Sequence, residues 1–201
     1  DGVLDVVAGH EVYSFLDGFS GYNQIRMNPA DQEKTAFVTE WGMFVAVVMM
    51  FGLKTGPTTF QRIIMEIFGE YIPGFMQVFL DDFAVYSRHG EHLDHLQQCL
   101  EKCREYQLSL NPAKCVFGVA SGNLLGHVVS KEGIAVDPDK VKVILEAPTP
   151  SNAKALSWFL GQIRWHSRMI RHLADFATPL HIAVHRVPFQ WRTPRRRPTK
   201  R

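Results

Sequence analysis

Two stretches of the chain are rich in apolar residues typical of β-strands, and both lead into aspartates. Residues 77–86 hold two such runs on either side of Asp81 and Asp82, which predicts a hairpin with the aspartate pair at its turn. Residues 3–16 form an apolar run that enters a second strand, which ends at Asp17. Aspartate is also a common turn residue, so the hairpin alone does not distinguish a functional pair from an ordinary turn.

Further strands are expected between and after these two stretches. Residues 34–39 and 43–50 predict a strand pair. Its continuously apolar run, residues 45–48, is expected at the centre of a sheet, because a half-exposed strand would alternate with polar residues. Residues 115–118 and 124–129 predict two short strands.

Apolar residues at helical spacing predict several helices. The first opens at Gly56-Pro57, where a proline costs no hydrogen bond. The second spans residues 91–106, and its buried stripe is predicted at Leu93, Leu96, Leu100 and Cys103. Later helices are expected to begin at Asp137, Ser151 and Pro179.

This order of elements predicts an α+β fold, an antiparallel sheet backed by helices and followed by a helical region. We divide the chain into residues 1–136 with the sheet, residues 137–185 with the later helices, and residues 186–201. The last segment combines prolines with arginines and cannot bury a core, which predicts a disordered basic tail.

Composition narrows the class of protein. The chain has 201 residues, of which 46% are hydrophobic, and this suits a globular protein with one good core or two small ones. No apolar run is long enough to span a bilayer. Three cysteines without paired spacing indicate an intracellular, reduced protein of the cytoplasm or nucleus. The chain begins with Asp1 and shows no signal peptide, so we expect a piece of a longer polypeptide.

Charge is distributed unevenly along the chain. Residues 1–100 hold 5 Lys and Arg against 13 Asp and Glu, and residues 101–185 hold 10 against 7. Residues 186–201 hold 7 basic residues and no acidic one. The acidic half contains the candidate metal site, and the basic half is suited to a nucleic-acid backbone or is simply solvated surface.

Two sets of residues are candidates for metal binding. Asp17 at the end of one strand, together with Asp81 and Asp82, would form a cradle of carboxylates, which Mg²⁺ prefers. The second set lies on the helix over residues 91–106 and has ligand-like spacing: His92, His95, Cys99 and Cys103. A tetrahedral zinc site needs ligands that converge from more than one direction, so we interpret this second set as an ordinary helix face.

At this point the sequence resembles the reverse transcriptases of gypsy-type LTR retrotransposons. The resemblance extends from about Leu4 to Leu180 and rests on an ordered series of motifs, because any one of them is weak by itself. The matching pieces are Ser14-Phe15-Leu16-Asp17, Ser20-Gly21-Tyr22, Phe51-Gly52-Leu53 with Pro57, Thr59, Phe60 and Gln61, Phe79-Leu80-Asp81-Asp82, Leu110-Asn111-Pro112-Ala113-Lys114-Cys115, Leu125-Gly126-His127 and Phe159-Leu160-Gly161.

The resemblance implies an RNA-directed DNA polymerase with a palm and a remnant of the fingers in residues 1–136 and a helical thumb in residues 137–185. It implies that the catalytic aspartates Asp17, Asp81 and Asp82 hold two Mg²⁺ ions, or alternatively Mn²⁺, with the carbonyl of Gly18 as a further ligand. It implies as partners an RNA or DNA template with its primer, and deoxynucleoside triphosphates. By the same resemblance, the nucleotide-binding residues are Tyr22, Phe51 and Gly52, and the template and primer residues are Pro57, Phe79, Leu125, Gly126 and His127.

The sequence departs from the family pattern in several places. Only sixteen residues precede Asp17, so we expect a piece that lacks the N-terminal fingers and the ribonuclease H domain of the family. Met50, Gly56 and Phe79 replace residues that are commoner in the family. Two other readings therefore stay open: a catalytically inactive remnant that only binds nucleic acid, and a plain interaction domain whose aspartates are turn residues.

Overall fold

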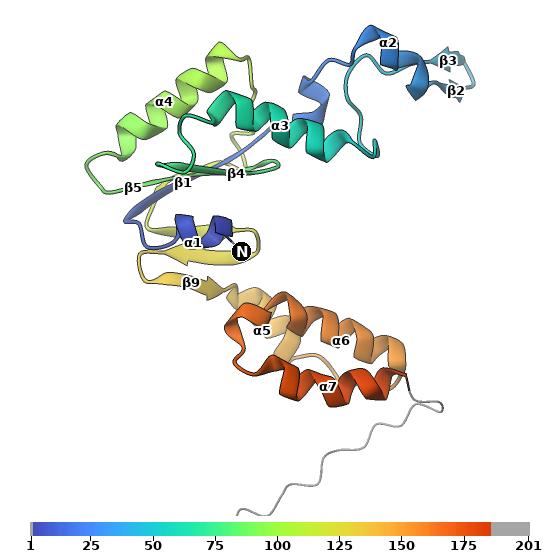
Figure 1. The fold of residues 1–201 in the computed structure, drawn as a ribbon, viewed down its shortest axis with the longest axis vertical. Coiled ribbons are helices and arrows are strands. Elements are labelled where there is room, and N and C mark those ends of the chain that lie inside the picture. Colours follow the sequence, from blue (N-terminus) through green and yellow to red (C-terminus); the bar gives the residue numbers. More distant parts are fainter. Residues whose placement is uncertain (1, 186–201) are drawn as a thin grey trace, which may run out of the picture. The chain divides into compact units, whose positions relative to one another are not determined.

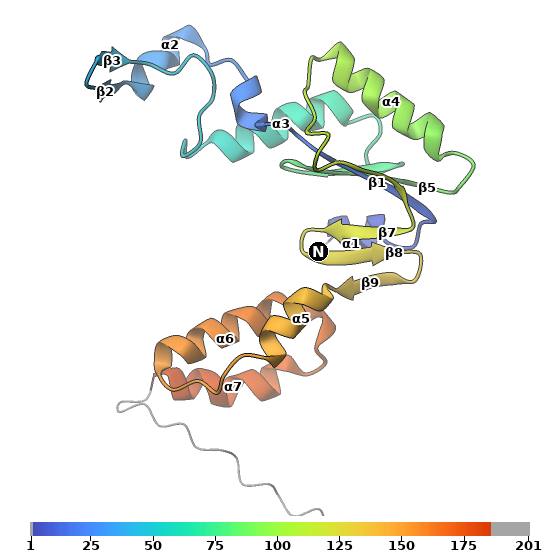
Figure 2. The ribbon, with the colours of Figure 1, turned by 180° about the vertical axis from the view of Figure 1, so that it is seen from behind.

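A computed structural model describes residues 2–185, and the basic tail predicted for residues 186–201 lies outside the described residues. Its central element is a four-stranded antiparallel sheet with the strand order β4-β5-β1-β6 (Figures 1 and 2). The strands are β1 (Val12–Asp17), β4 (Met76–Phe79), β5 (Asp82–Ser87) and β6 (Val116–Val119). The predicted hairpin is therefore present as β4 and β5, and the strand that leads to Asp17 lies next to β5.

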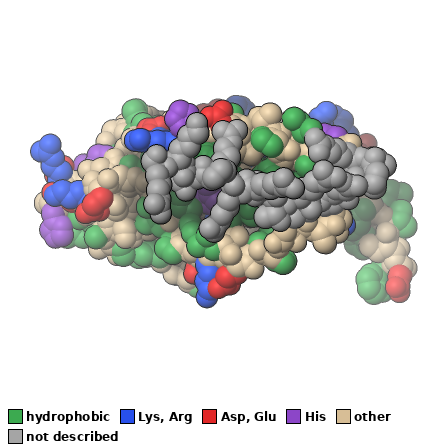
Figure 3. Space-filling view, turned by 90° about the horizontal axis from the view of Figure 1, so that it is seen from below, with side chains coloured by type: hydrophobic (Ala, Val, Ile, Leu, Met, Phe, Trp, Pro, Cys, Tyr) green, Lys and Arg blue, Asp and Glu red, His purple; other side chains and the backbone are tan. Residues whose placement is uncertain are grey.

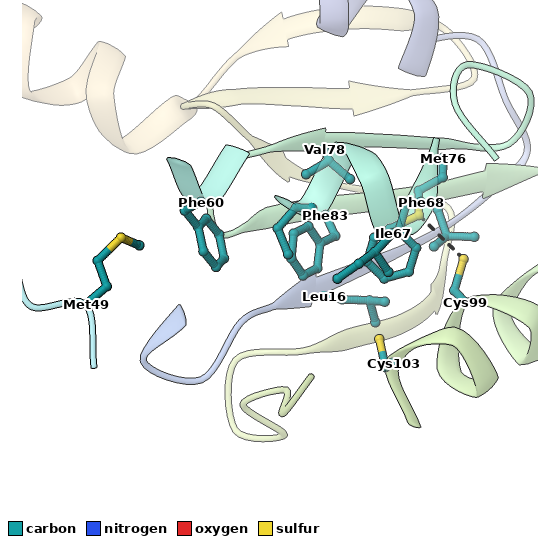
Figure 4. Packing of buried hydrophobic residues seen from close by; sticks show 12 residues of the cluster. Leu16, Met49, Phe60, Ile67, Phe68, Met76, Val78, Phe83, Cys99 and Cys103 are labelled. Carbon is teal, nitrogen blue, oxygen red and sulfur yellow. Dashed lines mark hydrogen bonds between the residues drawn. The ribbon is translucent and has the colours of Figure 1, made fainter. Parts of the chain in front are cut away.

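Helices α3 (Gly56–Phe68) and α4 (His92–Glu105) lie on one side of this sheet (Figure 1). Between them and the strands is the larger apolar cluster, in which Phe60 and Phe68 of α3 pack with Leu16 and Phe83 (Figure 4). The start of α3 at Gly56-Pro57 is confirmed, and its face holds the buried residues Phe60, Ile64, Ile67 and Phe68.

The opposite side of the sheet carries a second cluster, formed with α1 (Gly2–Val7), β7 (Ser121–Leu124) and β8 (His127–Ser130). In Figure 2 these elements lie below the sheet, away from α3 and α4. Strand β9 (Gly133–Val136) completes a second sheet in the order β7-β8-β9. Buried residues on this side include Leu4, Tyr13, Tyr86 and Val129.

Three predicted strands are corrected here. The first part of the apolar run over residues 3–16 is the helix α1, whose Leu4 and Val7 point inward at helical spacing. The run over 115–118 begins one residue later, as β6. The run over 124–129 contains a turn at Leu125-Gly126, both with positive φ, so that it is the end of β7 and most of β8 rather than one strand.

The stretch around Trp41 forms a small two-stranded hairpin, β2 (Phe37–Thr39) with β3 (Gly42–Phe44). The predicted pairing is confirmed, but the expected central position of residues 45–48 is wrong, since Val47 is 60% exposed. A continuous apolar run does not by itself decide whether a segment is buried. The hairpin is preceded by a 3-10 turn η1 (Gly21–Gln24), the helix α2 (Pro29–Gln32) and a 3-10 turn η2 (Glu33–Thr35).

Helix α4 has the predicted extent but a different buried face. Leu93 is 78% exposed, whereas His92, Cys99 and Cys103 are buried. The Sγ of Cys99 lies 3.6 Å from the Sδ of Met76 within the larger cluster (Figure 4). The predicted leucine stripe is therefore wrong for Leu93 and Leu100, because histidine and cysteine take the inner positions of this helix.

The chain forms two compact units, which divide between Ile134 and Ala135. The second unit contains α5 (Pro138–Leu145), α6 (Ala153–Trp165), a 3-10 turn η3 (Ser167–Met169) and α7 (Leu173–Val184). Asp137 caps α5 as predicted, with its carboxylate accepting a hydrogen bond from the N–H of Asp139 at 3.0 Å.

Two helix starts in the second unit differ from the prediction. Asn152, not Ser151, caps α6, because its side chain accepts the N–H of Ala155 at 2.9 Å. Helix α7 begins at Leu173, six residues before Pro179, which lies inside it. Apolar side chains remain on the surface of this unit, among them Leu145 at 79% and Phe176 at 68% exposure. In the view of the molecule in Figure 3, hydrophobic groups lie among charged ones. Among the described residues, no helix has the length and apolar character needed to cross a membrane.

Candidate active site

Three aspartates lie at one end of the four-stranded sheet. Asp17, the last residue of β1, lies directly opposite Asp82, the first residue of β5. The N–H of Gly18 donates to the carbonyl of Asp81 at 3.2 Å, so the backbone after Asp17 also contacts the turn of the hairpin. Adjacent antiparallel strands thus bring together carboxylates that are more than sixty positions apart in the sequence.

The turn between β4 and β5 consists of Leu80 and Asp81, one residue earlier than predicted, and Leu80 has a φ of 54°. The side chain of Gln61, from α3, holds this turn. Its Oε1 accepts the N–H of Leu80 at 2.7 Å, and its Nε2 donates to the carbonyl of Val78 at 3.3 Å. Gln61 belongs to the motif series but had no predicted role, because nothing in the sequence alone shows which backbone groups an amide will meet.

Asp81 points into a tight space beside the start of η1. Its Oδ1 is buried and has no hydrogen-bond partner within residues 2–185. A Cβ added at Gly21 would lie 2.6 Å from that oxygen and 2.7 Å from the ring of Phe60. Glycine is therefore required at position 21 by close approach, and the carboxylate is left with an unsatisfied oxygen that a cation would satisfy.

Burial and like charge act together on the two carboxyls of the hairpin. Burial raises the pKa of Asp81 above its ordinary value, and the charges of Asp17 and Asp82 raise it further. Burial and the charge of Asp17 likewise raise the pKa of Asp82. The ammonium of Lys114 opposes both shifts. The cluster is thus short of positive charge, which a divalent cation would supply.

Asp17 is held by the segment that follows α4. The Nζ of Lys114 lies 3.4 Å from the Oδ2 of Asp17. The backbone N–H of Asp17 donates to the Sγ of Cys115 at 3.4 Å, and the carbonyl of Asp17 accepts the N–H of Asn111 at 2.8 Å. Lys114 and Cys115 belong to a motif of the family series but had no predicted role. Their contribution depends on a long-range contact that spacing along the chain does not reveal.

A second set of contacts fixes the loop after Asp17. The carboxamide of Gln24 donates to the carbonyl of Ser109 at 3.0 Å and accepts the N–H of Ser109 at 2.7 Å. The N–H of Phe19 also donates to the carbonyl of Ser109, at 3.0 Å. Gly18 forms an antiparallel bridge with Leu110. The backbone that carries Asp17 is therefore paired on one side with β5 and on the other with residues 109–111.

Two hollows lie near the aspartates. One, of about 310 Å³, contains Asp17, Asp82 and Lys114 in its lining, together with Phe15, Leu16, Val116, Gly122 and Asn123. The other, of about 210 Å³, is lined by Tyr22, Met50, Phe51, Gly52, Leu53, Gly56 and Pro57. Tyr22 meets the ring of Phe51 edge-on, with a centroid separation of 5.0 Å. The structure thus brings the predicted residues Tyr22, Phe51, Gly52 and Pro57 around one hollow.

The model of the reverse transcriptase family, "Reverse transcriptase (RNA-dependent DNA polymerase)", matches residues 2–156. The chain belongs to the reverse transcriptase family. It is 32% identical over 193 residues to the "Retrovirus-related Pol polyprotein from transposon 412" of Drosophila melanogaster, covering 95% of this chain and 16% of that protein. It is 36% identical over 169 residues to the corresponding polyprotein from transposon opus of the same organism, covering 84% of this chain and 17% of the relative.

This reverse transcriptase chain therefore spans about a sixth of the length of these curated relatives. Among solved structures, a foamy viral protease-reverse transcriptase in complex with an RNA/DNA hybrid matches with a TM-score of 0.83 at 20% identity, covering 91% of this chain and 25% of that one. The resemblance to gypsy-type reverse transcriptases is confirmed, as is the α+β polymerase fold.

The remaining predicted residues of this reverse transcriptase chain lie at other places on the first unit. Phe79 ends β4, directly opposite Asp82, and is 45% exposed. Leu125 and Gly126 form the turn between β7 and β8, and His127 begins β8 with its ring Nδ1 at 3.2 Å from the carbonyl of Leu125. This turn is next to the second cluster, on the other side of the sheet from α3.

The donor set fits a hard divalent cation better than zinc. Within residues 2–185, no three His, Cys, Asp or Glu side chains are arranged as they stand to hold a metal ion. However, Asp17, Asp81 and Asp82 offer only carboxylate oxygens, which suit Mg²⁺, and one oxygen of Asp81 is buried without a partner. On α4, the ring of His92 is instead hydrogen-bonded to serines, and Cys99 and Cys103 belong to the core.

Proposed function

We propose that the chain carries the catalytic palm of an RNA-directed DNA polymerase, which extends a primer 3′-hydroxyl by nucleotidyl transfer at a site of two metal ions. The observation that carries the proposal is the register of Asp17 against Asp82, with the partly desolvated carboxylate of Asp81 beside them. If the aspartates were only turn residues, we would expect neither their grouping from separate strands nor a buried Oδ1 of Asp81 without a partner.

In this proposal Asp17, Asp81 and Asp82, with the carbonyl of Gly18, would hold two Mg²⁺ ions, and Mn²⁺ is the alternative. When bound, these ions would neutralise the triphosphate and make the primer hydroxyl a better nucleophile. The chain's own contribution is to hold the three carboxylates on paired strands, so that little reorganisation is needed when charge develops. Lys114 supplies a positive charge to Asp17 from within the chain.

The two hollows accommodate the substrates in the same proposal. Tyr22, with Phe51 and Gly52, would bind the incoming deoxynucleoside triphosphate, and the ring of Tyr22 would exclude a 2′-hydroxyl. Its ring is held from two sides, by Phe51 and by Phe60 at a centroid separation of 5.3 Å, so it cannot easily move away. Pro57 lines the same hollow, where it would support the template strand.

The primer would lie along the exposed end of the sheet. Phe79 is exposed opposite Asp82, and the turn formed by Leu125, Gly126 and His127 would hold the primer end. We further propose residues 1–136 as palm with a remnant of the fingers, residues 137–185 as helical thumb and residues 186–201 as a basic tail. Foamy viral structures of this fold were solved with an RNA/DNA hybrid and with double-stranded DNA, which supports a template with its primer as partner.

The alternative is a catalytically inactive remnant that binds nucleic acid without extending it. It is favoured by one feature, the ion pair between Lys114 and Asp17, because a lysine can replace a missing cation permanently. The two functions differ in what they require of Asp82. Catalysis needs its carboxylate, whereas binding of a polyanion is improved when a negative charge is removed.

The experiment is primer extension by the 201-residue chain on an RNA template, with Mg²⁺ and all four deoxynucleotides, beside a measurement of template–primer affinity. We expect extension by the wild type, none by Asp82→Asn, and wild-type extension by the matched control Asp94→Asn, whose side chain is exposed on α4. Binding without extension by the wild type would establish the inactive remnant. Absence of both would leave only an interaction domain.

A further inference from the structure

A buried histidine lies in the first unit and belongs neither to the carboxylate cluster nor to the lining of the two hollows. His92, the first residue of α4, is only 4% exposed, although the helix around it is largely solvated. Its Nε2 lies 2.7 Å from the Oγ of Ser14, and its Nδ1 lies 3.0 Å from the Oγ of Ser87. Both serines are buried as well, at 0% and 4% exposure. Buried polar groups of this kind have to be matched to one another, because each unmatched one is costly.

The two serines belong to the strands that carry the catalytic carboxylates. Ser14 lies opposite Val85, and Ser87 lies opposite Val12, so the serines are diagonal neighbours on the same face of β1 and β5. Asp17 is three residues beyond Ser14, and Asp82 is five residues before Ser87. The ring of His92 is therefore a cross-link between the same two strands that place Asp17 next to Asp82.

The connection continues to the edge strand β6. The N–H of Gly118 donates to the Oγ of Ser14 at 3.0 Å, and Gly118 has a φ of 61°. Pairing of β1 with β6 shifts register between Tyr13 and Phe15, which is the position of Ser14. The hydroxyl of Ser14 thus accepts a backbone hydrogen bond where the pairing of β1 with β6 is irregular. Through this hydroxyl, β6 is connected to His92.

The other end of the network is His95, one turn further along α4. Its Nδ1 lies 3.0 Å from the Oγ of Ser87, and its ring stacks on Phe75 with a centroid separation of 4.0 Å and an interplanar angle of 7°. His95 is therefore fixed in place by Phe75, and Ser87 is held between two imidazole rings.

The available donors and acceptors determine the direction of each hydrogen bond in the network. Ser14 accepts the N–H of Gly118, so its own hydroxyl proton is free to go to Nε2 of His92. Nδ1–H of His92 then donates to Ser87, whose hydroxyl donates to Nδ1 of His95. In this arrangement His92 is neutral and every hydroxyl of the network has an acceptor. A protonated ring would instead leave the hydroxyl of Ser14 without one.

Burial lowers the pKa of His92 below its ordinary value, and the neighbouring His95 and His89 lower it further. The three groups that hold or face its ring from β1, β5 and α4 are Ser14, Ser87 and His95, and none of them is acidic. The surroundings therefore favour the same neutral form that the donor count requires.

We propose that His92 is a positioning residue for the reverse transcriptase reaction: its neutral ring ties Ser14 of β1 to Ser87 of β5 and so holds Asp17 opposite Asp82. A change of one residue in strand register would turn every side chain of β1 to the other face, and a smaller slip would separate the carboxylates. The role in catalysis rests on the proposed function of these carboxylates, whereas the strand tie does not.

The first test concerns the tie itself and needs no activity. In ¹⁵N NMR spectra of the full chain at pH 7, we expect His92 as the neutral tautomer protonated on Nδ1. Ser14→Ala and His92→Gln should speed amide hydrogen exchange along β1 and β5, whereas His89→Gln, the same change on an exposed neighbouring loop, should not. An imidazolium, the opposite tautomer, or unchanged exchange in both variants would overturn the proposal.

The second test separates positioning from general stability. We expect Ser14→Ala and His92→Gln to lower kcat for primer extension by about 10- to 100-fold with little change in the KM for nucleotide, because small displacements of reacting groups reduce rate rather than binding. The double variant should lose no more than the worse single variant. Val129→Ala, which removes a fully buried side chain from the second cluster, should keep its kcat at temperatures below unfolding.

If Val129→Ala lowers kcat as much as Ser14→Ala, the network acts only through stability, and the positioning role is overturned. If the wild type itself shows no extension, the proposed function fails, and the exchange and tautomer measurements still decide whether the strand tie exists.

Discussion

Replacing Gly21 with alanine should damage the carboxylate site from a position that carries no functional group. The new Cβ would lie 2.6 Å from the Oδ1 of Asp81 and 2.7 Å from the ring of Phe60, whereas ordinary contacts begin at 3.4 Å. The contact with Asp81 is about 0.8 Å too short and the contact with Phe60 about 0.7 Å too short, so both have to be relieved. Phe60 is fully buried in the larger cluster and has little room to move, so much of the displacement falls on Asp81.

Overpacking of a dense core by one methyl group costs about 1–3 kcal/mol. With a urea dependence of about 2 kcal/mol per M, the midpoint of unfolding should fall by about 0.5–1.5 M. Urea unfolding followed by circular dichroism measures this shift, and primer extension should fall with it. The matched control is Gly90→Ala in the same unit, where an added Cβ meets nothing within 4 Å. We expect its stability to be unchanged or slightly raised. Equal midpoints for the two variants would refute the close approach at Gly21.

Three other changes have definite expected outcomes. Gln61→Leu should lower the free energy of unfolding by about 1–3 kcal/mol, because the N–H of Leu80 loses its acceptor, and Gln61→Glu, which keeps an acceptor, should lose less in the same urea titration. Asp81→Asn should abolish extension without destabilising the metal-free chain. Because folding raises the pKa of Asp81, ionisation of this carboxyl opposes folding as pH rises through the raised pKa. The melting temperature of Asp81→Asn should therefore exceed that of the wild type by more at pH 7 than at pH 4. A difference that grows toward acid pH would contradict this. Tyr22→Ala should raise ribonucleotide incorporation relative to deoxyribonucleotide, and an unchanged ratio in steady-state extension would leave Tyr22 as a core residue.

The parts of the site that the sequence revealed are those with strong local chemistry. Asp17 and the Asp81-Asp82 pair each follow an apolar run, and such runs become paired strands. Gly56-Pro57 marked the start of α3 correctly, because proline is compatible with only a few helix positions. The order of the motifs then identified the family, which pattern analysis of any single segment would have missed.

The parts that could not be predicted depend on contacts between distant residues. On α4 a leucine stripe was expected, but Leu93 is exposed and His92 is buried, because Ser14 and Ser87 satisfy both nitrogens of its ring. A prediction from the spacing of apolar residues treats histidine as polar, and it therefore gave the wrong buried face for α4. The one-residue error in the hairpin turn has a similar origin, since Gln61 of another helix stabilises Leu80 with a positive φ.

The role of Lys114 also required the fold. Its ammonium lies 3.4 Å from the carboxylate of Asp17, although ninety-seven positions separate the two residues. In the sequence it was one basic residue in a mildly basic segment. The structure makes it a resident counter-charge at the acidic cluster, which a divalent cation would have to share or displace.

In the proposed function, the three aspartates form the cation site of a reverse transcriptase. The most direct test is the number of Mn²⁺ ions bound per chain, measured by electron paramagnetic resonance. The sample contains a deoxynucleoside triphosphate and a template–primer whose primer lacks its 3′-hydroxyl. We predict two ions per chain for the wild type and for Asp94→Asn, and the loss of at least one ion for Asp17→Asn. Identical Mn²⁺ binding by Asp17→Asn and the wild type would contradict the assignment of the site.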